Sequence, residues 1–454
     1  MKKEDLTLRQ CWSFLAVLLL VLFVGCGYFQ LNSQVLLLVC TLLAAAFARW
    51  KGYSVREIEA MAVNGIRTIV IALIINICIG MLISVWISAG TFSLFIQLCL
   101  KIVNPRFLLV ETFVFCCIFS ALIGSCWICA GTVGLSLFYL ADMVEINPYL
   151  LLGAIVGGSR FGACISPISD SANVSVLLSG VQNIYEHIRA MLRIVLPSAL
   201  LTGIVYVCID FAVGASRGTL NDTTLEENLE QLFGDNVLAL LPALVLCLMI
   251  YRRKTTLSCL LASIMTGALV TILVQGKSVY EVANILYYGY GSSFSSEDPL
   301  LNNLFARGGI ASMAGVIFTL IIGMSLSGIL GQLGVLKIIV NKLAGQVKSP
   351  REIVLISMLM SILGYGATGD SQPSKVLVSD AFSNLYRQKG LKKGVLSRSL
   401  ELSAFGEGMF PWSVGAAYFL GLFQIQVGQY WYFILFYYIT MAANVLLLFP
   451  KDME

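Results

Sequence analysis

Charged side chains are scarce in this sequence. Only 12% of its 454 residues are Asp, Glu, Lys or Arg, whereas soluble domains average about 25%. So few charges cannot cover the water-exposed surface of a chain of this length, and 58% of the residues are apolar. The same composition excludes an intrinsically disordered chain. We therefore expect most of the protein's surface to face lipid.

Histidine and basic clusters are also rare, and this excludes several functions. The single histidine, His187, excludes HExxH zinc chemistry, a haem-ligand pair and most hydrolytic triads. Cys126 and Cys129 form a CxxC pair, but no second pair completes a zinc site. No basic run is longer than residues 252–254, so nucleic acid is not an expected partner. We predict neither enzyme activity nor a cofactor.

Long apolar runs are the feature that the sequence has in abundance. The mean hydropathy is +0.87, and a membrane-spanning helix needs about 20 mostly apolar residues. The length accommodates about ten to thirteen such spans with their loops. We predict an all-α polytopic membrane protein.

Four segments rich in glycine, proline, serine and acids interrupt the apolar runs: 124–134, 157–173, 364–374 and 405–415. Phe161, Gly162, Pro167 and Ser169 recur as Phe405, Gly406, Pro411 and Ser413, all shifted by about 244 positions. The recurrence indicates duplication, although glycine and proline are common in any helical membrane protein. Paired broken helices are typical of secondary transporters. We therefore predict two inverted repeats with broken helices or re-entrant segments, with breaks at Gly162, Pro167, Pro373, Gly406 and Pro411.

The repeat divides the chain into four parts. Residues 1–60 form an N-terminal helical hairpin and cytoplasmic loop, and 61–213 form the first transporter repeat. Residues 214–305 form an acidic linker with connecting helices, and 306–454 form the second repeat. Positive residues flank both ends of the hairpin, so the N-terminus is predicted to be cytoplasmic; they are Lys2, Lys3, Arg49, Lys51 and Arg56.

Oxygen-bearing side chains gather around the first proline break. Such oxygens suit a small hard cation, and in the first half they belong to Ser166, Ser169, Asp170, Ser171 and Asn173. The counterparts in the second half are Thr368, Asp370, Glu407 and Ser413. A carboxylate removed from water holds either a proton or a cation, which is the minimum that cation/proton exchange requires. Asp170 is the first candidate for that carboxylate. The alternative is that Asp170 and Asp370 only cap helices.

Four further charged residues stand close to the breaks: Arg160, Lys375, Arg398 and Glu401. Such residues form structural ion pairs more often than they contact a substrate. An anionic substrate would nevertheless need one of the three cations. Their role is left open between these two readings.

At these motifs the sequence resembles the NhaC-type sodium/proton antiporter family, part of the ion-transporter superfamily. The matching stretches are GMLISVWISAGT (80–91), GSCWICAGTVG (124–134), GGSRFGACISPISDSAN (157–173), EHIRAMLRIVLP (186–197), LSRSLE (396–401) and PWSVG (411–415). The resemblance implies a multi-pass carrier of the bacterial cytoplasmic (inner) membrane with inverted repeats, which transports Na+ and H+. Its expected partners are the lipid bilayer and a small ion or small molecule, and a homodimer is left open.

The sequence departs from the family pattern at two acids. Ala163 and Leu402 stand where the family usually has carboxylates, and Glu407 occupies the repeat position that matches Ala163. One hypothesis is that Glu407 replaces the lost acid from the other half. Another is that the substrate or the coupling has changed.

Sodium/proton antiport, through competition of cation and proton for intramembrane carboxylates, is the leading prediction. The alternative is a sodium- or proton-coupled exchanger of organic anions or amino acids, similar to the malate/lactate exchangers of the family. An intramembrane protease using Asp170 and Asp370, or a channel, is disfavoured by the repeat and by the absence of a filter motif.

Overall fold

The fold is built from helices. The computed structural model describes residues 6–29, 31–143, 146–213, 231–234, 236–252, 254–293, 305 and 308–447, and within these ranges there is no β-strand. The all-α prediction is confirmed. Much of the predicted linker (214–230, 235 and 294–304) lies outside the described residues.

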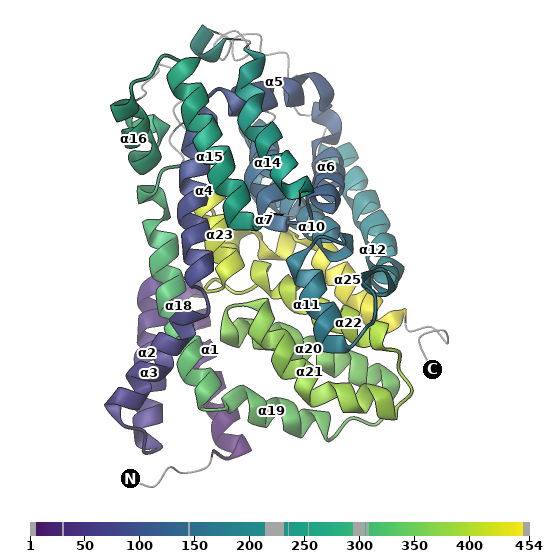
Figure 1. Ribbon diagram of the computed structural model, residues 1–454. Coiled ribbons are helices and arrows are strands. Elements are labelled where there is room, and N and C mark those ends of the chain that lie inside the picture. The colour runs from purple at the N-terminus through teal and green to yellow at the C-terminus, as the bar shows by residue number, and fades with distance from the viewer. Residues whose placement is uncertain are drawn as a thin grey trace.

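The N-terminal helices of the described chain pack on one another in sequence order. They are α1 (Leu8–Gly27), α2 (Ser33–Trp50) and α3 (Val55–Arg67). The rings of Phe14 and Phe47 stack with centroids 4.1 Å apart and join α1 to α2. Both α2 and α3 pack on α18 (Ala314–Gln332), so these two helices lie against the second half of the chain (Figure 1).

The first half contains the next nine helices. They are α4 (Val70–Ser88), α5 (Thr91–Ile102), α6 (Leu108–Ile123), α7 (Cys126–Cys129), α8 (Leu135–Phe138), α9 (Leu140–Met143), α10 (Pro148–Ile165), α11 (Asp170–Ser179) and α12 (Ile184–Val213). Helices α4 and α5 meet at 73° across Gly90, whose φ is 81°. Between α7 and α8 the segment Ala130–Gly134 is a π-helix.

Among the described residues, three helices of ten or more residues follow α12, and the second half comes after them. The three are α14 (Leu241–Tyr251), α15 (Thr256–Leu273) and α16 (Val279–Tyr288). The second half continues from α18 with α19 (Val335–Ala344), α20 (Pro350–Thr368), α21 (Ser371–Gln388), α22 (Lys393–Glu401), the 3-10 segment η7 (Leu402–Gly408), α23 (Val414–Phe423), α24 (Val427–Tyr430) and α25 (Leu435–Leu446). Helix α11 of the first half lies beside α21 and α22 (Figure 1).

Six helices of the described chain are long and apolar enough to cross a membrane, and the bent pair α4–α5 is a seventh candidate. A multi-pass membrane protein is therefore confirmed. Six further apolar helical segments have 10–17 residues, among them Leu8–Leu22 of α1 and Gln34–Trp50 of α2. Ten to thirteen spans would need these shorter helices to cross as parts of broken spans, and that number stays a prediction.

Two glycines that we expected to break helices allow close packing. Gly162 lies inside α10, where an added Cβ would come within 2.2 Å of the Ala121 backbone nitrogen on α6. Gly406 lies inside η7, and its added Cβ would be 2.7 Å from Cγ of Tyr365. The prediction of a break was wrong for Gly162, which lies within a continuous helix, because a glycine also recurs where two helices touch. Gly406 does lie in the interruption between α22 and α23.

We expect Gly162→Ala to destabilise the protein by about 1 to 3 kcal/mol, since its methyl group would push α10 away from the α6 backbone. The matched control is Gly203→Ala on α12, where nothing lies within 4 Å of the added Cβ. That change should be neutral or slightly stabilising, since alanine favours helix more than glycine does. Thermal unfolding in detergent checks both variants, and equal midpoints would contradict the close contact.

The break near Pro373 also lies elsewhere than expected. Helix α20 ends at Gly369, whose φ is 72°, and α21 begins at Ser371, so Pro373 belongs to the first turn of α21. A proline is tolerated there because the first N–H groups of a helix have no intrahelical partner. Pro167 and Pro411, in contrast, do lie in non-helical turns, as predicted.

Candidate functional site

The two breaks of the first half touch each other. Helix α6 ends at Gly124, whose φ is 76°, and α10 ends just before Ser166. A Cβ added to Gly124 would lie 2.5 Å from Cγ1 of Ile168 and 3.0 Å from Oγ of Ser166. Ser166 Oγ is buried and has no hydrogen-bond partner among the described residues. The crossing therefore brings an oxygen suited to a cation next to two helix ends.

The second half has a crossing of the same kind. Val414 N donates a 2.9 Å hydrogen bond to the carbonyl of Gly369, and the Trp412 indole N–H donates to the carbonyl of Gly366. Ser413 caps α23 as Ser169 caps α11, and these residues are 244 positions apart. The local geometry of the two halves thus corresponds. That the halves are inverted relative to each other stays a prediction.

Asp170 lies at the edge of a cavity rather than in the protein interior. It is the first residue of α11 and is exposed, while Ser169 caps the helix. The cavity has a volume of about 510 Å³, and Asn173, Ser125 and Lys254 line it together with Asp170. The Asn173 amide donates 2.8 Å to the Ser169 carbonyl and so ties the cavity wall to the break. The Asp170 side chain is therefore accessible from the cavity and is not buried.

Glu401 is a buried carboxylate that is enclosed by polar groups. It is fully buried at the end of α22, and its Oε2 accepts hydrogen bonds of 2.8 Å from Lys375 Nζ and 2.7 Å from Ser175 Oγ. Ser171 Oγ donates to its Oε1 over 2.7 Å. Lys375 Nζ also contacts the hydroxyl and the carbonyl oxygens of Ser171, at 2.7 and 2.8 Å. Three predicted candidates, Ser171, Lys375 and Glu401, therefore meet in one cluster, which we call the Glu401 cluster with Ser175 as its fourth member.

Glu407 forms a second buried cluster. Its Oε1 pairs with the guanidinium of Arg160, whose Nε lies 3.1 Å away, and accepts a 3.2 Å hydrogen bond from the hydroxyl of Tyr437. Cys126 Sγ is 3.9 Å from the same oxygen. Arg160 lies one turn before Ala163, so Glu407 reaches the part of α10 that carries Ala163. In both clusters an acid of the second half contacts groups of the first half.

The remaining predicted residues have local roles or lie apart. Asp370 caps α21 by accepting from Gln372 N over 3.0 Å, and Thr368 donates to the carbonyls of Gly364 and Asp370. The Ser413 hydroxyl donates to the carbonyl of Glu407 over 3.2 Å. Arg398 is fully buried on α22, one turn before Glu401. The contacts of Asp370 are thus those of a helix cap, which is the alternative role considered for it above.

The sequence did not single out several residues of these clusters. Ser175 stands four positions after Ser171, and this helical spacing was a usable signal. Tyr437, in an apolar run, gave none. His187 was used only to exclude functions, yet it is buried, and its Nδ1 lies 2.7 Å from Oγ of Ser397, one turn before Glu401.

Comparison with known proteins agrees with this architecture. The Na+/H+ antiporter family model matches residues 5–182 and 173–450. An uncharacterized Na+/H+ antiporter of Haemophilus influenzae is 31% identical over 93% of this chain and 92% of its own length. The Na+/H+ antiporter NhaC of Alkalihalophilus pseudofirmus is 27% identical over 95% and 93%, and the malate-2H+/Na+-lactate antiporter of Bacillus subtilis is 27% identical over 92% and 89%. The chain belongs to the Na+/H+ antiporter family and is an NhaC-type member of it.

Proposed function

We propose that this protein exchanges Na+ for H+ across the bacterial cytoplasmic membrane, with Na+ binding at Glu401 and the proton leaving from Lys375. The observation that supports this most is the Glu401 cluster, in which a fully buried carboxylate is held by two serine hydroxyls and one lysine. We further propose a cytoplasmic N-terminus. No cofactor, nucleic acid or protein partner is required; a homodimer remains compatible with this function.

The difference between lysine and arginine distinguishes the two buried pairs. An arginine side chain keeps its proton in proteins, so Arg160 always offers Glu407 a positive charge. A lysine ammonium can release its proton. Only the pair of Lys375 and Glu401 can therefore give up a proton when a cation arrives. We assign exchange to this pair and assign a structural role to Arg160 and Glu407.

Charge balance then couples the two ions. Lys375 and Glu401 together carry no net charge, and an uncompensated charge in a buried site is costly. A Na+ ion that binds Glu401 and the hydroxyls of Ser171 and Ser175 adds one positive charge. Loss of one proton from Lys375 removes this added charge. When Lys375 binds a proton again, the Na+ ion is released. Hard oxygen ligands of this kind suit Na+.

Asp170 has the geometry of an entry residue for the cation. It lies in the open cavity, and its neighbour Ser171 touches Glu401, so one turn of α11 connects the cavity with the cluster. We expect Asp170→Asn to raise the half-saturating Na+ concentration about tenfold without abolishing exchange, because a charged cleft concentrates its counter-ion.

The experiment uses everted membrane vesicles with a pH-sensitive dye. An imposed pH gradient should dissipate on addition of Na+, and the dependence on Na+ concentration gives the half-saturating value. Asp380→Asn is the matched control, since Asp380 is exposed on α21 and does not line the cavity. No response of the wild type to Na+ would contradict the proposed function. Complete loss of Na+-driven exchange in Asp170→Asn would instead assign the exchange site to Asp170.

The size of the cavity favours one second candidate, exchange of a small organic solute. A volume of about 510 Å³ exceeds what a Na+ ion needs, and the cavity wall carries Lys254 as well as Asp170. The similarity to the malate-2H+/Na+-lactate antiporter is in keeping with this candidate. Against it, the buried cations Arg160 and Lys375 already pair with carboxylates. Uptake of labelled malate or lactate in the absence of any Na+-driven pH response would favour it.

A further inference from the structure

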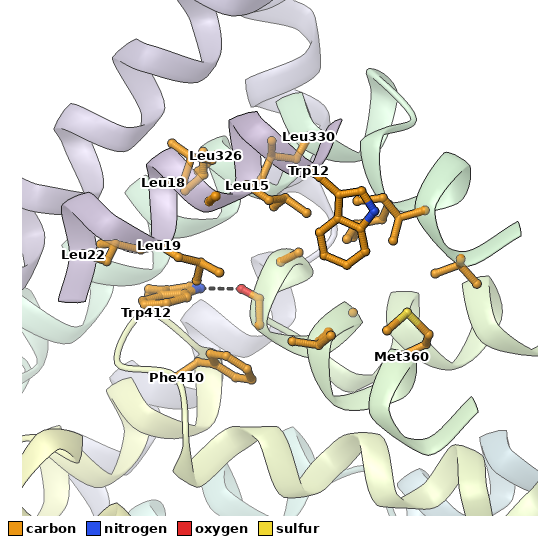
Figure 2. Close-up of a pocket in the computed structure, with 18 of the residues that line it drawn as sticks. Trp12, Leu15, Leu18, Leu19, Leu22, Leu326, Leu330, Met360, Phe410 and Trp412 are labelled. Atoms are coloured by element: carbon orange, nitrogen blue, oxygen red, sulfur yellow. Dashed lines mark hydrogen bonds between the residues drawn. The ribbon is translucent and has the colours of Figure 1, made fainter. Parts of the chain in front are cut away.

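An apolar cavity of about 230 Å³ lies between the N-terminal helix and the second half of the protein (Figure 2). Its walls belong to α1, α18, α19 and α20 and to the break at 409–413. Apart from glycines, every residue that lines it has an aliphatic, aromatic or thioether side chain. The one polar group of Trp412, its indole N–H, already donates to the Gly366 carbonyl. The cavity therefore has the chemistry of a hydrocarbon site.

Side chains of α1 line the cavity from Trp12 to Leu22. Figure 2 shows Trp12 and Leu330 on one side of the cavity, and Leu22 with Trp412 on the opposite side. Ten residues separate Trp12 from Leu22, which is about 15 Å along a helix. The hydrocarbon core of a bilayer is about 30 Å thick, so one leaflet accounts for about half of it. The cavity thus matches the length of an acyl chain of one leaflet.

The Trp12 end of the cavity carries positive charge. Trp12 is 43% exposed, and tryptophan is typical of the membrane–water interface. Arg9 is exposed one turn before it, and Lys337 is exposed next to the lining residue Leu336. Helix α19 buries its apolar face and exposes Lys337 and Lys342, as a helix at a membrane surface does. Basic residues at this depth attract anionic lipid headgroups.

We propose that the cavity binds one acyl chain of an anionic phospholipid whose headgroup contacts Arg9 and Lys337. This lipid site is separate from the exchange clusters and does not depend on which solute is carried. The chain would end against Phe410 and Trp412, which precede the cap of α23. A bound lipid would therefore support the second break from the membrane side.

The test is lipid retention by the full-length protein, measured by native mass spectrometry. The purified protein is delipidated and then offered phosphatidylglycerol or phosphatidylethanolamine with the same acyl chains. We expect phosphatidylglycerol to be retained about twentyfold more strongly, as two favourable charges imply. Arg9→Gln with Lys337→Gln should remove this preference. The control pair Lys348→Gln with Arg351→Gln, also exposed, should keep it.

The acyl-chain part of the proposal is tested by filling the cavity. Ala16→Phe places a ring in the cavity, whereas Leu20→Phe places one on the same helix at a residue that is 63% exposed and does not line it. Ala16→Phe should lose the bound lipid and Leu20→Phe should retain it. Equal retention by both variants, or equal retention of the two lipid classes by the wild type, would overturn the proposal.

A measurement on the wild type alone tests the lipid site without relying on a variant that could misfold. Phosphatidylglycerol with brominated acyl chains, added to the protein in detergent, should quench tryptophan fluorescence more strongly than brominated phosphatidylethanolamine, since Trp12 and Trp412 line the cavity. Equal quenching by the two lipids would contradict a headgroup-selective site.

Discussion

The double variant Glu401→Gln with Lys375→Met is expected to lose Na+-driven proton movement by at least about a hundredfold while remaining folded. It removes both charges of a pair that is entirely buried and joined over 2.8 Å. Replacing a whole buried ion pair by neutral groups of similar size is often close to neutral for stability. The carboxylate that binds the cation and the ammonium that releases the proton are both gone, so exchange has no chemical basis. Dye-monitored exchange in proteoliposomes measures the loss.

The matched control replaces both residues of the other buried pair in the same way. Glu407→Gln with Arg160→Met also removes one carboxylate and one cation from the boundary between the two halves. Because Arg160 cannot release a proton, we expect this variant to retain exchange within about fivefold of the wild type. If the Glu407 double variant were inactive and the Glu401 double variant active, the assignment of the two pairs would have to be reversed.

The second large effect concerns the stability of the pair of Arg160 and Glu407. Arg160→Met alone should destabilise the protein by about 3 to 5 kcal/mol, since it leaves a buried carboxylate with only neutral partners, Tyr437 and Cys126. Thermal unfolding in detergent, followed by tryptophan fluorescence, measures this loss.

Rescue distinguishes loss of the pair from general damage at this position. Adding Glu407→Gln to Arg160→Met should restore most of the stability, because no charge is then left unpaired. Tyr437→Phe is a milder control and should cost about 1 kcal/mol, the value of one hydrogen bond. A double variant no more stable than Arg160→Met alone would contradict a structural ion pair.

Much of the fold could be predicted from the composition and from the positions of proline and glycine. Long apolar runs indicate helices in lipid, and Pro167 and Pro411 mark real breaks because proline cannot continue a helix. Glycine was a less reliable sign of a helix break than proline. Gly124 and Gly369 end helices with positive φ, whereas Gly162 and Gly406 lie where another element leaves no room for a side chain. Sequence pattern alone does not separate these two uses of glycine.

The site was predicted only in part, because pairing across the two halves is a tertiary property. The residues of the Glu401 cluster stood among the candidates, except Ser175, but nothing in their spacing shows that Ser171 and Glu401, 230 positions apart, touch. Asp170 ranked first because it is an acid beside a proline, yet its side chain lies in an open cavity. Burial, which decides how strongly a carboxylate needs a partner, cannot be seen from local sequence.

The most direct test of the exchange site is proton release on sodium binding to the purified protein. Na+ is added to the protein in weakly buffered detergent solution, and the protons released are counted against the Na+ bound. We predict about one proton per Na+ for the wild type and for Glu407→Gln with Arg160→Met, and none for Glu401→Gln with Lys375→Met. Sodium binding without proton release in the wild type, or unchanged release in the Glu401 double variant, would contradict the exchange of Na+ for a proton at Lys375 and Glu401.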